Sequence, residues 1–299
     1  MRISEALATM RPFFSFEFFP PKDDDGAMRL FATIQTLLPL RPAFVSITYG
    51  AGGSTRERTV ALAKRIQSDT GLTVMAHVTC VGSSRAELRS IFDDLARAGI
   101  ENVLALRGDP PKGSAQFESP PSGFSHANEM IAMLKRNYDF CIGAACYPET
   151  HVEAASDEDD MRALRAKVDA GADFLVSQLF FNNDRFVDFR ARASDAGVKV
   201  PMLPGLMPIT TYQQVARFTS SIGATIPPKL LRELELRRDD PKAVEDLGVA
   251  YAALQATELL QSGAPGVHFY TLNRSPATRA IVSALIPGSA WRPTFSPAR

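Results

Sequence analysis

The chain has 299 residues, of which 33 are basic, 33 are acidic and 45% are hydrophobic. A formal net charge of zero argues against nucleic acid as the main partner, because phosphate binding usually needs a basic surface. Three cysteines are too few for a disulfide framework, no apolar run approaches the roughly 20 residues of a membrane span, and no signal-peptide pattern begins the chain. We therefore expect a reduced, cytoplasmic protein without a membrane segment.

Eight short apolar segments follow one another along the chain, and most are near-continuous in Val, Ile, Leu, Phe and Ala. This pattern is typical of strands that are covered on both faces, as in parallel sheets. The predicted strands lie within residues 13–19, 42–50, 73–80, 102–109, 139–148, 172–181, 200–208 and 266–273.

Helical patterns separate these segments. Ser84 followed by Glu87 forms a capping box, and the helix that it opens should end at Gly99. Ser275 and Pro276 predict an N-cap and a first helical residue for the last helix. Further helices are predicted over residues 157–172 and 241–263.

The predicted strands start about thirty residues apart with helices between them, which predicts a (β/α)8 TIM barrel that spans residues 1–299 as one catalytic domain. A doubly wound sheet is the competing fold, but the glycine fingerprint expected after its first strand is absent. The long interval over residues 210–264 predicts extra helices between strands 7 and 8. Within it, the charge run over residues 232–242 is interpreted as a solvated helix and turn.

Polar side chains occur near the end of nearly every predicted strand, which is where barrels of this kind place their chemistry. They are Glu17, Thr48, Tyr49, His77, Thr79, Asp109, Tyr147, His151, Gln178, Asn273 and Arg274. Such a ring of groups predicts a polar-lined pocket. Structural alternatives stay open, since Glu17 could pair with Arg107 or Lys22. His77 could be a core histidine, and Asp109 could only shape its turn.

Other motifs carry weaker signals. The glycine-rich residues 49–55 lack the Gly-Lys-Ser/Thr ending of a P-loop, so they predict only a flexible loop. The four histidines lack the close spacing of a zinc site, and Cys141 and Cys146 have no second pair of ligands. We therefore expect no metal.

Eight motifs occur in one order: SFEFFPPK, FVSITYGAGGS, AHVTC, ALRGDPP, AACYPETH, KVDAGADFLVSQLFF, PGLMPI and HFYTLNR. Together, over residues 13–274, they resemble the methylenetetrahydrofolate reductase family in its bacterial form, which consists of the catalytic domain only. The resemblance implies a barrel that binds FAD at the strand exits without a Rossmann fold. It also implies a ping-pong reaction through FAD, in which NADH or NADPH reduces 5,10-methylenetetrahydrofolate to 5-methyltetrahydrofolate. The family forms homo-oligomers and serves one-carbon metabolism and methionine biosynthesis.

The resemblance also implies roles, position by position. Glu17 is similar to the general acid that opens the methylene bridge, and Asp109 to the aspartate near the flavin pyrimidine. The positions that resemble flavin contacts are Thr48, His77, Arg107, Gly108, Asp109, Ala145, Tyr147, His151, Asp160 and Lys167. The positions that resemble the face shared by folate and nicotinamide are Glu17, Gln178, Phe218, Leu272 and Arg274, with Arg274 at the folate tail.

One departure from the family pattern concerns the helix after predicted strand 5. Ala163 and Ala166 stand where some relatives carry polar or basic residues, and Arg165 or Lys167 could compensate, so the contacts to the FAD phosphates stay open. At Glu17, we expect the surrounding phenylalanines to disfavour the charged form and so keep a proton available for donation. The carboxylate of Asp109 would add to this effect.

Two rival functions use the same pocket. A pterin-binding barrel methyltransferase would need no flavin, so a yellow protein bleached by NADH would exclude it. A non-catalytic binding or assembly subunit would bind its ligand without turnover. The sequence leaves open the choice between NADH and NADPH, the oligomeric state and the preferred length of the folate polyglutamate.

Overall fold

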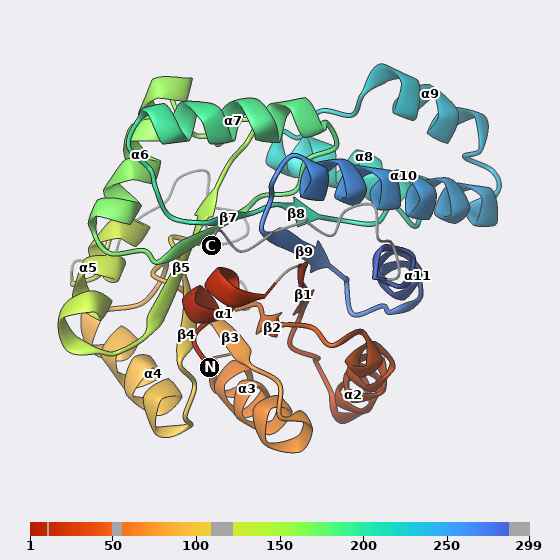
Figure 1. Cartoon of the computed structure of the whole chain (residues 1–299). Coiled ribbons are helices and arrows are strands. Elements are labelled where there is room, and N and C mark those ends of the chain that lie inside the picture. Colours follow the sequence, from red (N-terminus) through yellow and green to blue (C-terminus); the bar gives the residue numbers. More distant parts are fainter. Residues whose placement is uncertain (11, 50–55, 109–121, 287–299) are drawn as a thin grey trace, which may run out of the picture.

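The computed structural model describes residues 1–10, 12–49, 56–108 and 122–286 of the chain (Figure 1). Its strands are β1 (Phe13–Phe18), β2 (Phe44–Ile47), β3 (Val74–Thr79), β4 (Asn102–Leu106), β5 (Cys141–Cys146), β6 (Phe174–Ser177), β7 (Met202–Leu203), β8 (Gly205–Leu206) and β9 (Gly266–Tyr270). Its helices are α1 (Ile3–Thr9), α2 (Asp24–Leu37), η1 (Leu38–Leu40), α3 (Arg56–Thr70), α4 (Arg85–Arg97), α5 (Ala127–Asn137), α6 (Asp157–Asp169), α7 (Asn183–Asp195), α8 (Tyr212–Ile222), α9 (Pro228–Leu236), α10 (Pro241–Gln261) and α11 (Pro276–Leu285).

The strands form one parallel sheet in the order β7-β6-β5-β4-β3-β2-β1-β9-β8. β7 and β8 are two halves of the seventh predicted strand, separated by Pro204. β7 pairs with β6, whereas β8 pairs with β9, so the sheet closes on itself. The predicted (β/α)8 barrel is therefore confirmed. The extra helices are also confirmed, because α8, α9 and α10 lie between β8 and β9.

The predicted helix starts are mostly correct. At α4, Ser84 Oγ accepts a hydrogen bond from Glu87 N at 3.2 Å, and the Glu87 carboxylate accepts one from Ser84 N at 2.8 Å, which confirms the capping box. The last helix begins at Pro276 as predicted, but Ser275 does not cap it with its side chain. Ser275 already has helical backbone angles, with φ −95° and ψ −28°, whereas a capping residue is usually extended.

Successive residues of each strand point to opposite sides of the barrel wall. On β1, Phe14, Phe16 and Phe18 point outward into the large core between the sheet and the helices. Phe13 points inward and belongs to the smaller core inside the barrel. That interior core also contains Phe44, Met75, Leu104, Phe174 and Leu203.

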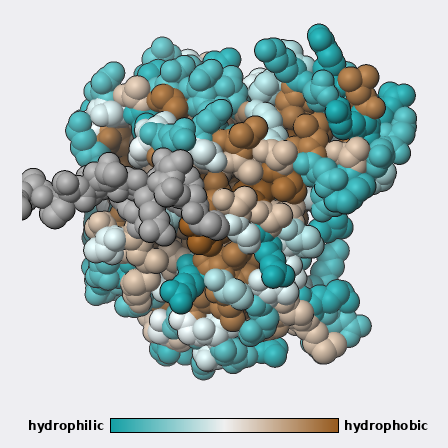
Figure 2. Space-filling view, turned by 45° about the vertical axis from the view of Figure 1, so that its right-hand side comes forward, coloured by the Kyte–Doolittle hydropathy of each residue, from teal (hydrophilic) through white to brown (hydrophobic). Residues whose placement is uncertain are grey.

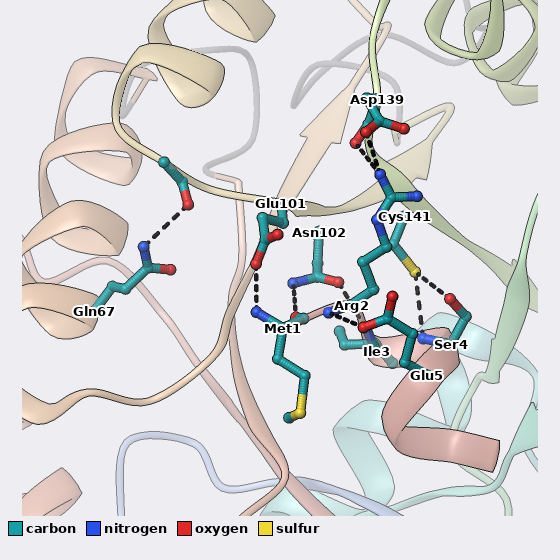
Figure 3. Close-up of polar contacts among 11 residues, drawn as sticks. Met1, Arg2, Ile3, Ser4, Glu5, Gln67, Glu101, Asn102, Asp139 and Cys141 are labelled. Carbon is teal, nitrogen blue, oxygen red and sulfur yellow. Dashed lines mark hydrogen bonds and ion pairs between the residues drawn. The ribbon is translucent and has the colours of Figure 1, made fainter. Parts of the chain in front are cut away.

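Helix α1, which the sequence analysis does not predict, packs on the amino-terminal ends of the strands. Its Ile3, Ala6 and Leu7 belong to the interior core. The buried Asn102 side chain accepts a hydrogen bond from Ile3 N at 2.8 Å and donates one to Met1 O at 3.1 Å (Figure 3). With this end covered, the carboxyl ends of the strands are the side where a ligand cavity can form.

In Figure 2, polar residues lie around the edge of the face shown, and apolar residues gather toward its middle. In the part of the chain that the structure describes, we find no helix that is long and apolar enough to cross a membrane.

Candidate active site

A cavity of about 1000 Å³ lies at the carboxyl ends of the strands. This volume is at the upper end of what small-molecule sites usually have, roughly 300–1000 Å³. The sequence-predicted site residues that line it are Glu17, Thr48, His77, Arg107, Gly108, Ala145, Tyr147, His151, Asp160, Lys167, Gln178 and Leu272. They come from segments far apart in the chain, and the closed sheet brings them together around one hollow.

The structure gives no side-chain position for two further predicted site residues, and a third does not line the cavity. Asp109 lies outside the described residues. Phe218 belongs to α8, but its side chain is also outside the described part. Arg274 is exposed and does not line the cavity, although it follows the lining residue Leu272 by two positions.

Glu17 lies at the floor of the cavity with an exposed fraction of 8%. Its Oε2 atom is 3.4 Å from His268 Nε2 and 3.5 Å from His77 Nε2. On its other side, the His268 ring contacts Ser15 Oγ through Nδ1 at 2.8 Å. The Ser15 hydroxyl group can donate to Nδ1 or accept from it, so the His268 ring can present either a proton or a lone pair to Glu17 at Nε2.

The setting of Glu17 differs from the one expected. Phe14, Phe16 and Phe18 pack on the outer side of the barrel wall, so they do not surround the carboxyl group. Of the four phenylalanines around Glu17 in sequence, only Phe19 lines the cavity. The expectation failed because a run of phenylalanines hides the alternation of a strand. Inside the barrel, the carboxyl group of Glu17 instead contacts the imidazole rings of His77 and His268.

His77 is buried, and burial lowers its pKa from 6.5 to about 4. The nearby carboxylate of Glu17 opposes this shift, whereas His268 adds to it. The imidazole is therefore neutral at pH 7. Its Nε2 atom has no hydrogen-bond partner within the described part of the chain, since the contact to Glu17 lacks hydrogen-bond geometry.

Tyr270 forms another part of the wall, directly beside Glu17 in the pairing of β9 with β1. Its hydroxyl group donates a hydrogen bond to Ser177 O at 2.6 Å. Burial, with a further contribution from Glu17, raises the pKa of this phenol well above 10. Gly205 makes room for the ring, because a Cβ there would lie 2.7 Å from the Tyr270 hydroxyl oxygen. Tyr270 is thus a fixed, uncharged neighbour of Glu17.

Gly108 lines the cavity and has no side chain, so its backbone forms part of the cavity wall. Its φ of +90° lies in the left-handed region, and a Cβ there would lie 2.4 Å from Val81 Cγ1 and 2.9 Å from Thr79 Cβ. Any other residue would therefore be strained and would push into Thr79 and Val81. The backbone here is open to close approach by a ligand.

Two cations that line the cavity are bonded to other protein groups. Arg107 Nη2 donates to Glu153 Oε1 at 2.9 Å, and this bond lowers the pKa of Glu153. The structural alternative in which Arg107 pairs with Glu17 is therefore wrong. Lys167 donates from Nζ to Ala145 O at 2.6 Å, and burial lowers the pKa of this amine.

The residues that depart from the family pattern, Ala163 and Ala166, lie on the face of α6 that borders the cavity. Ala163 and Ala166 line the cavity, as does Arg162, which pairs with Asp159. Arg165 does not line it and instead pairs with Asp169 at 3.5 Å. Of the two proposed compensating residues, only Lys167 is thus in position, and Arg162 is a third cation that sequence reasoning missed.

Sequence reasoning also missed the roles of His268, Tyr270 and Glu153. His268 and Tyr270 stand two residues apart in HFYTLN, so they point to the same face of one strand. That spacing was the available signal. Glu153 follows His151 in a loop, where no periodic pattern indicates its partner.

The sheet is a closed (β/α)8 barrel, and a cavity with a buried carboxyl group at its floor lies at the carboxyl ends of the strands. These features are typical of a barrel enzyme that acts on a small molecule. Residues 2–286 match the family model described as Methylenetetrahydrofolate reductase. The chain belongs to the methylenetetrahydrofolate reductase family.

Individual relatives agree with this assignment. The 5,10-methylenetetrahydrofolate reductase of Escherichia coli (strain K12) is 37% identical over 271 residues, which cover 91% of this chain and 90% of that protein. Methylenetetrahydrofolate reductase (NADH) 1 of Arabidopsis thaliana is 38% identical over 271 residues, covering 87% of this chain and 46% of that protein.

Among solved structures, a protein from Clostridium thermocellum is similar in fold. It is described as an uncharacterized protein that binds two copies of 5-methyl-5,6,7,8-tetrahydrofolic acid. The TM-score is 0.59 at 14% identity, and the match covers 95% of this chain and 97% of that chain. At this identity the likeness supports the barrel fold alone.

Proposed function

We propose that the protein reduces 5,10-methylenetetrahydrofolate to 5-methyltetrahydrofolate with NADH or NADPH, in a ping-pong reaction through FAD. The observation that carries the proposal is the buried carboxyl group of Glu17 at the floor of the cavity, in contact with His268 and His77 in a chain of this family. The name of the Arabidopsis thaliana relative specifies NADH, which favours NADH as the reductant.

The residues around the cavity suit FAD. The backbone at Gly108 is open to close approach, and the buried polar atoms of His77 and Thr79 lack partners within the described part of the chain. Arg162 and Lys167, on the α6 side of the cavity, are the cations that would meet a diphosphate. When bound, FAD would take a hydride from the nicotinamide and pass it to the methylene carbon of the folate.

Glu17 would supply the proton that opens the methylene bridge, by donating it to a bridge nitrogen. Its contact with His268 supports this role, because it holds the carboxyl group in one place at the floor of the cavity. The His268 ring is in turn held from inside the barrel by Ser15. The neutral His77 places no positive charge beside Glu17 at pH 7.

The remaining roles follow the resemblance and stay proposals. Asp109 would lie near the flavin pyrimidine and help to hold the pterin. The flavin contacts would come from Thr48, His77, Arg107, Gly108, Ala145, Tyr147, His151, Asp160 and Lys167. The folate and the nicotinamide would take turns against Gln178, Phe218 and Leu272, with the folate tail at Arg274. We also propose that residues 1–299 act as one catalytic domain, in a cytoplasmic homo-oligomer.

Anaerobic titration of the purified protein tests this function. We expect a yellow protein whose visible absorbance is bleached by NADH and restored by 5,10-methylenetetrahydrofolate, with 5-methyltetrahydrofolate as product. A colourless protein that does not bind added FAD would contradict the proposal. Methyl transfer from 5-methyltetrahydrofolate to a corrinoid or thiol without flavin would instead establish the barrel methyltransferase.

A further inference from the structure

Thr79, at the carboxyl end of β3, carries a buried hydroxyl group to which none of the roles above assigns a function. The side chain is 9% exposed and lines the cavity. Its Oγ1 atom has no hydrogen-bond partner among the residues that the structure describes. Burying a hydroxyl group without a partner is costly, so native proteins usually keep one only where a ligand or an ordered water completes it.

The position of this hydroxyl group is fixed by the backbone around it. β3 pairs with β4 up to Thr79 and Leu106, and the pairing continues beyond the strands through Cys80 N to Leu106 O at 3.0 Å and Val81 N to Arg107 O at 2.9 Å. Gly108 packs so closely that a Cβ would touch Thr79. A group held this rigidly is pre-organised, so a ligand that bonds to it need not order it first.

The surroundings of Thr79 indicate what kind of ligand atom it meets. Val81, Leu106 and Gly108 are its neighbours by packing and strand pairing, and none is charged. Arg107, the nearest cation in sequence, is already bonded by Glu153. The negative charge of a phosphate group would meet no opposite charge among these neighbours. An uncharged oxygen or nitrogen atom of a ring would need none.

We propose that Thr79 Oγ1 forms a hydrogen bond with a polar atom of the flavin ring when FAD binds. The inference rests on the proposed function, since it needs a flavin in this cavity. His77 stands two residues earlier on the same face of β3, so both side chains point into the same hollow. β3 thereby contributes two polar groups to the wall against which the ring would lie.

The isosteric substitution Thr79→Val tests the proposal, because it removes the hydroxyl group and keeps the branched shape. Among the described residues this hydroxyl group has no partner in the apoprotein, so the melting temperature should stay the same or rise. The dissociation constant for FAD, measured by quenching of flavin fluorescence, should increase about three- to ten-fold. FMN shares the ring but lacks the adenylate, and its dissociation constant should increase by a similar factor.

Thr79→Ser is the matched control, since it keeps the hydroxyl group and should bind FAD within about two-fold of the wild-type protein. Equal FAD affinity of Thr79→Val and wild type would overturn the inference and leave the proposed function standing. A loss with FAD but none with FMN would overturn the assignment to the ring. A lower melting temperature of the Thr79→Val apoprotein would show a structural role and overturn it too. If wild-type protein binds neither flavin, the proposed function fails, and this inference fails with it.

Discussion

His268 Nε2 lies 3.4 Å from Glu17 Oε2, although the two residues are 251 positions apart in the chain. The pairing of β1 with β9 brings them together, because it sets Ser15 opposite His268 and Glu17 opposite Tyr270. The fully buried His268 ring is held by the Ser15 contact and by stacking on Phe44, with ring centroids 5.6 Å apart. The pairing of β1 with β9 therefore determines the environment of Glu17, the proposed proton donor.

Ser15→Ala should loosen the His268 ring that holds Glu17, since it removes the hydroxyl group bonded to His268 Nδ1 at 2.8 Å. We expect reduction of the flavin by NADH to be unchanged and reduction of folate to slow about ten-fold, at the low end of general acid catalysis. Single-turnover absorbance measurements separate the two steps. Ser46→Ala is the control, because Ser46 Oγ is 3.5 Å from the same ring and should matter less. Equal effects of the two substitutions would argue against a positioning role of the Ser15–His268 contact.

The stability of the protein should fall in mild acid because of His77. Its pKa is 6.5 in a model peptide and about 4 in the folded protein. Between these values the unfolded chain binds the proton and the folded protein does not, so stability rises with pH across this window and is lost as pH falls. The shift corresponds to about 2 kcal/mol of unfolding free energy between pH 7 and pH 5.

Urea unfolding of wild-type protein and His77→Asn at pH 7 and pH 5 measures this effect. The substitution removes the titrating group, so the wild-type protein should lose more stability than the variant on going to pH 5. Parallel losses in both proteins would mean that other groups account for the pH dependence.

Gly108→Ala should damage both the fold and the cavity. The added Cβ would meet Val81 and Thr79, whereas at Gly82, which also has positive φ, a Cβ meets nothing within 4 Å. Both substitutions place a side chain at positive φ. The difference between the two variants therefore measures the clash of the Gly108 Cβ with Val81 and Thr79. We expect Gly108→Ala to lose about 1–3 kcal/mol more unfolding free energy than Gly82→Ala and to bind FAD more weakly. Urea unfolding and flavin titration check both effects, and similar losses for the two variants would contradict the close packing.

Glu149 joins two loops near the cavity. Its carboxylate accepts hydrogen bonds from Thr225 N at 3.2 and 3.1 Å, which ties the segment after β5 to the segment after α8. Helix α8 supplies Ile222 to the cavity lining. We expect Glu149→Ala to speed hydrogen exchange in the last turn of α8 and at Thr225 about ten-fold, and to leave α7 unchanged.

Mass spectrometry of hydrogen exchange makes this comparison. Glu158→Ala serves as the control, because it removes an exposed carboxylate from α6 without touching the Glu149–Thr225 contact. If exchange in α8 is the same in Glu149→Ala and wild-type protein, the contact does not hold this helix in place.

Much of the fold was predictable because parallel strands buried on both faces appear as continuous apolar runs. The same continuity hid which face each residue occupies. At β1 the phenylalanines gave no period-2 pattern, so Glu17 was assigned the apolar setting that belongs to the other side of the wall. The break at Pro204 escaped notice because one apolar run covers both β7 and β8.

Other features depend on contacts between distant segments. Helix α1 has only 7 residues, too few for local propensity to predict, and its position depends on Asn102 and the interior core. The contacts of His268 with Glu17, and of Glu153 with Arg107, follow from the register and loop paths of the closed barrel. For the same reason, only the structure reveals that the Thr79 hydroxyl group has no partner among the described residues.

The most direct measurement is anaerobic stopped-flow of Glu17→Gln, with both half-reactions followed through the flavin absorbance. Glutamine keeps the shape of the side chain but cannot donate the proton. We expect flavin reduction by NADH to proceed close to the wild-type rate, and reoxidation by 5,10-methylenetetrahydrofolate to slow by about 10²–10⁴-fold. Reoxidation at the wild-type rate would contradict the role of Glu17 as the proton donor.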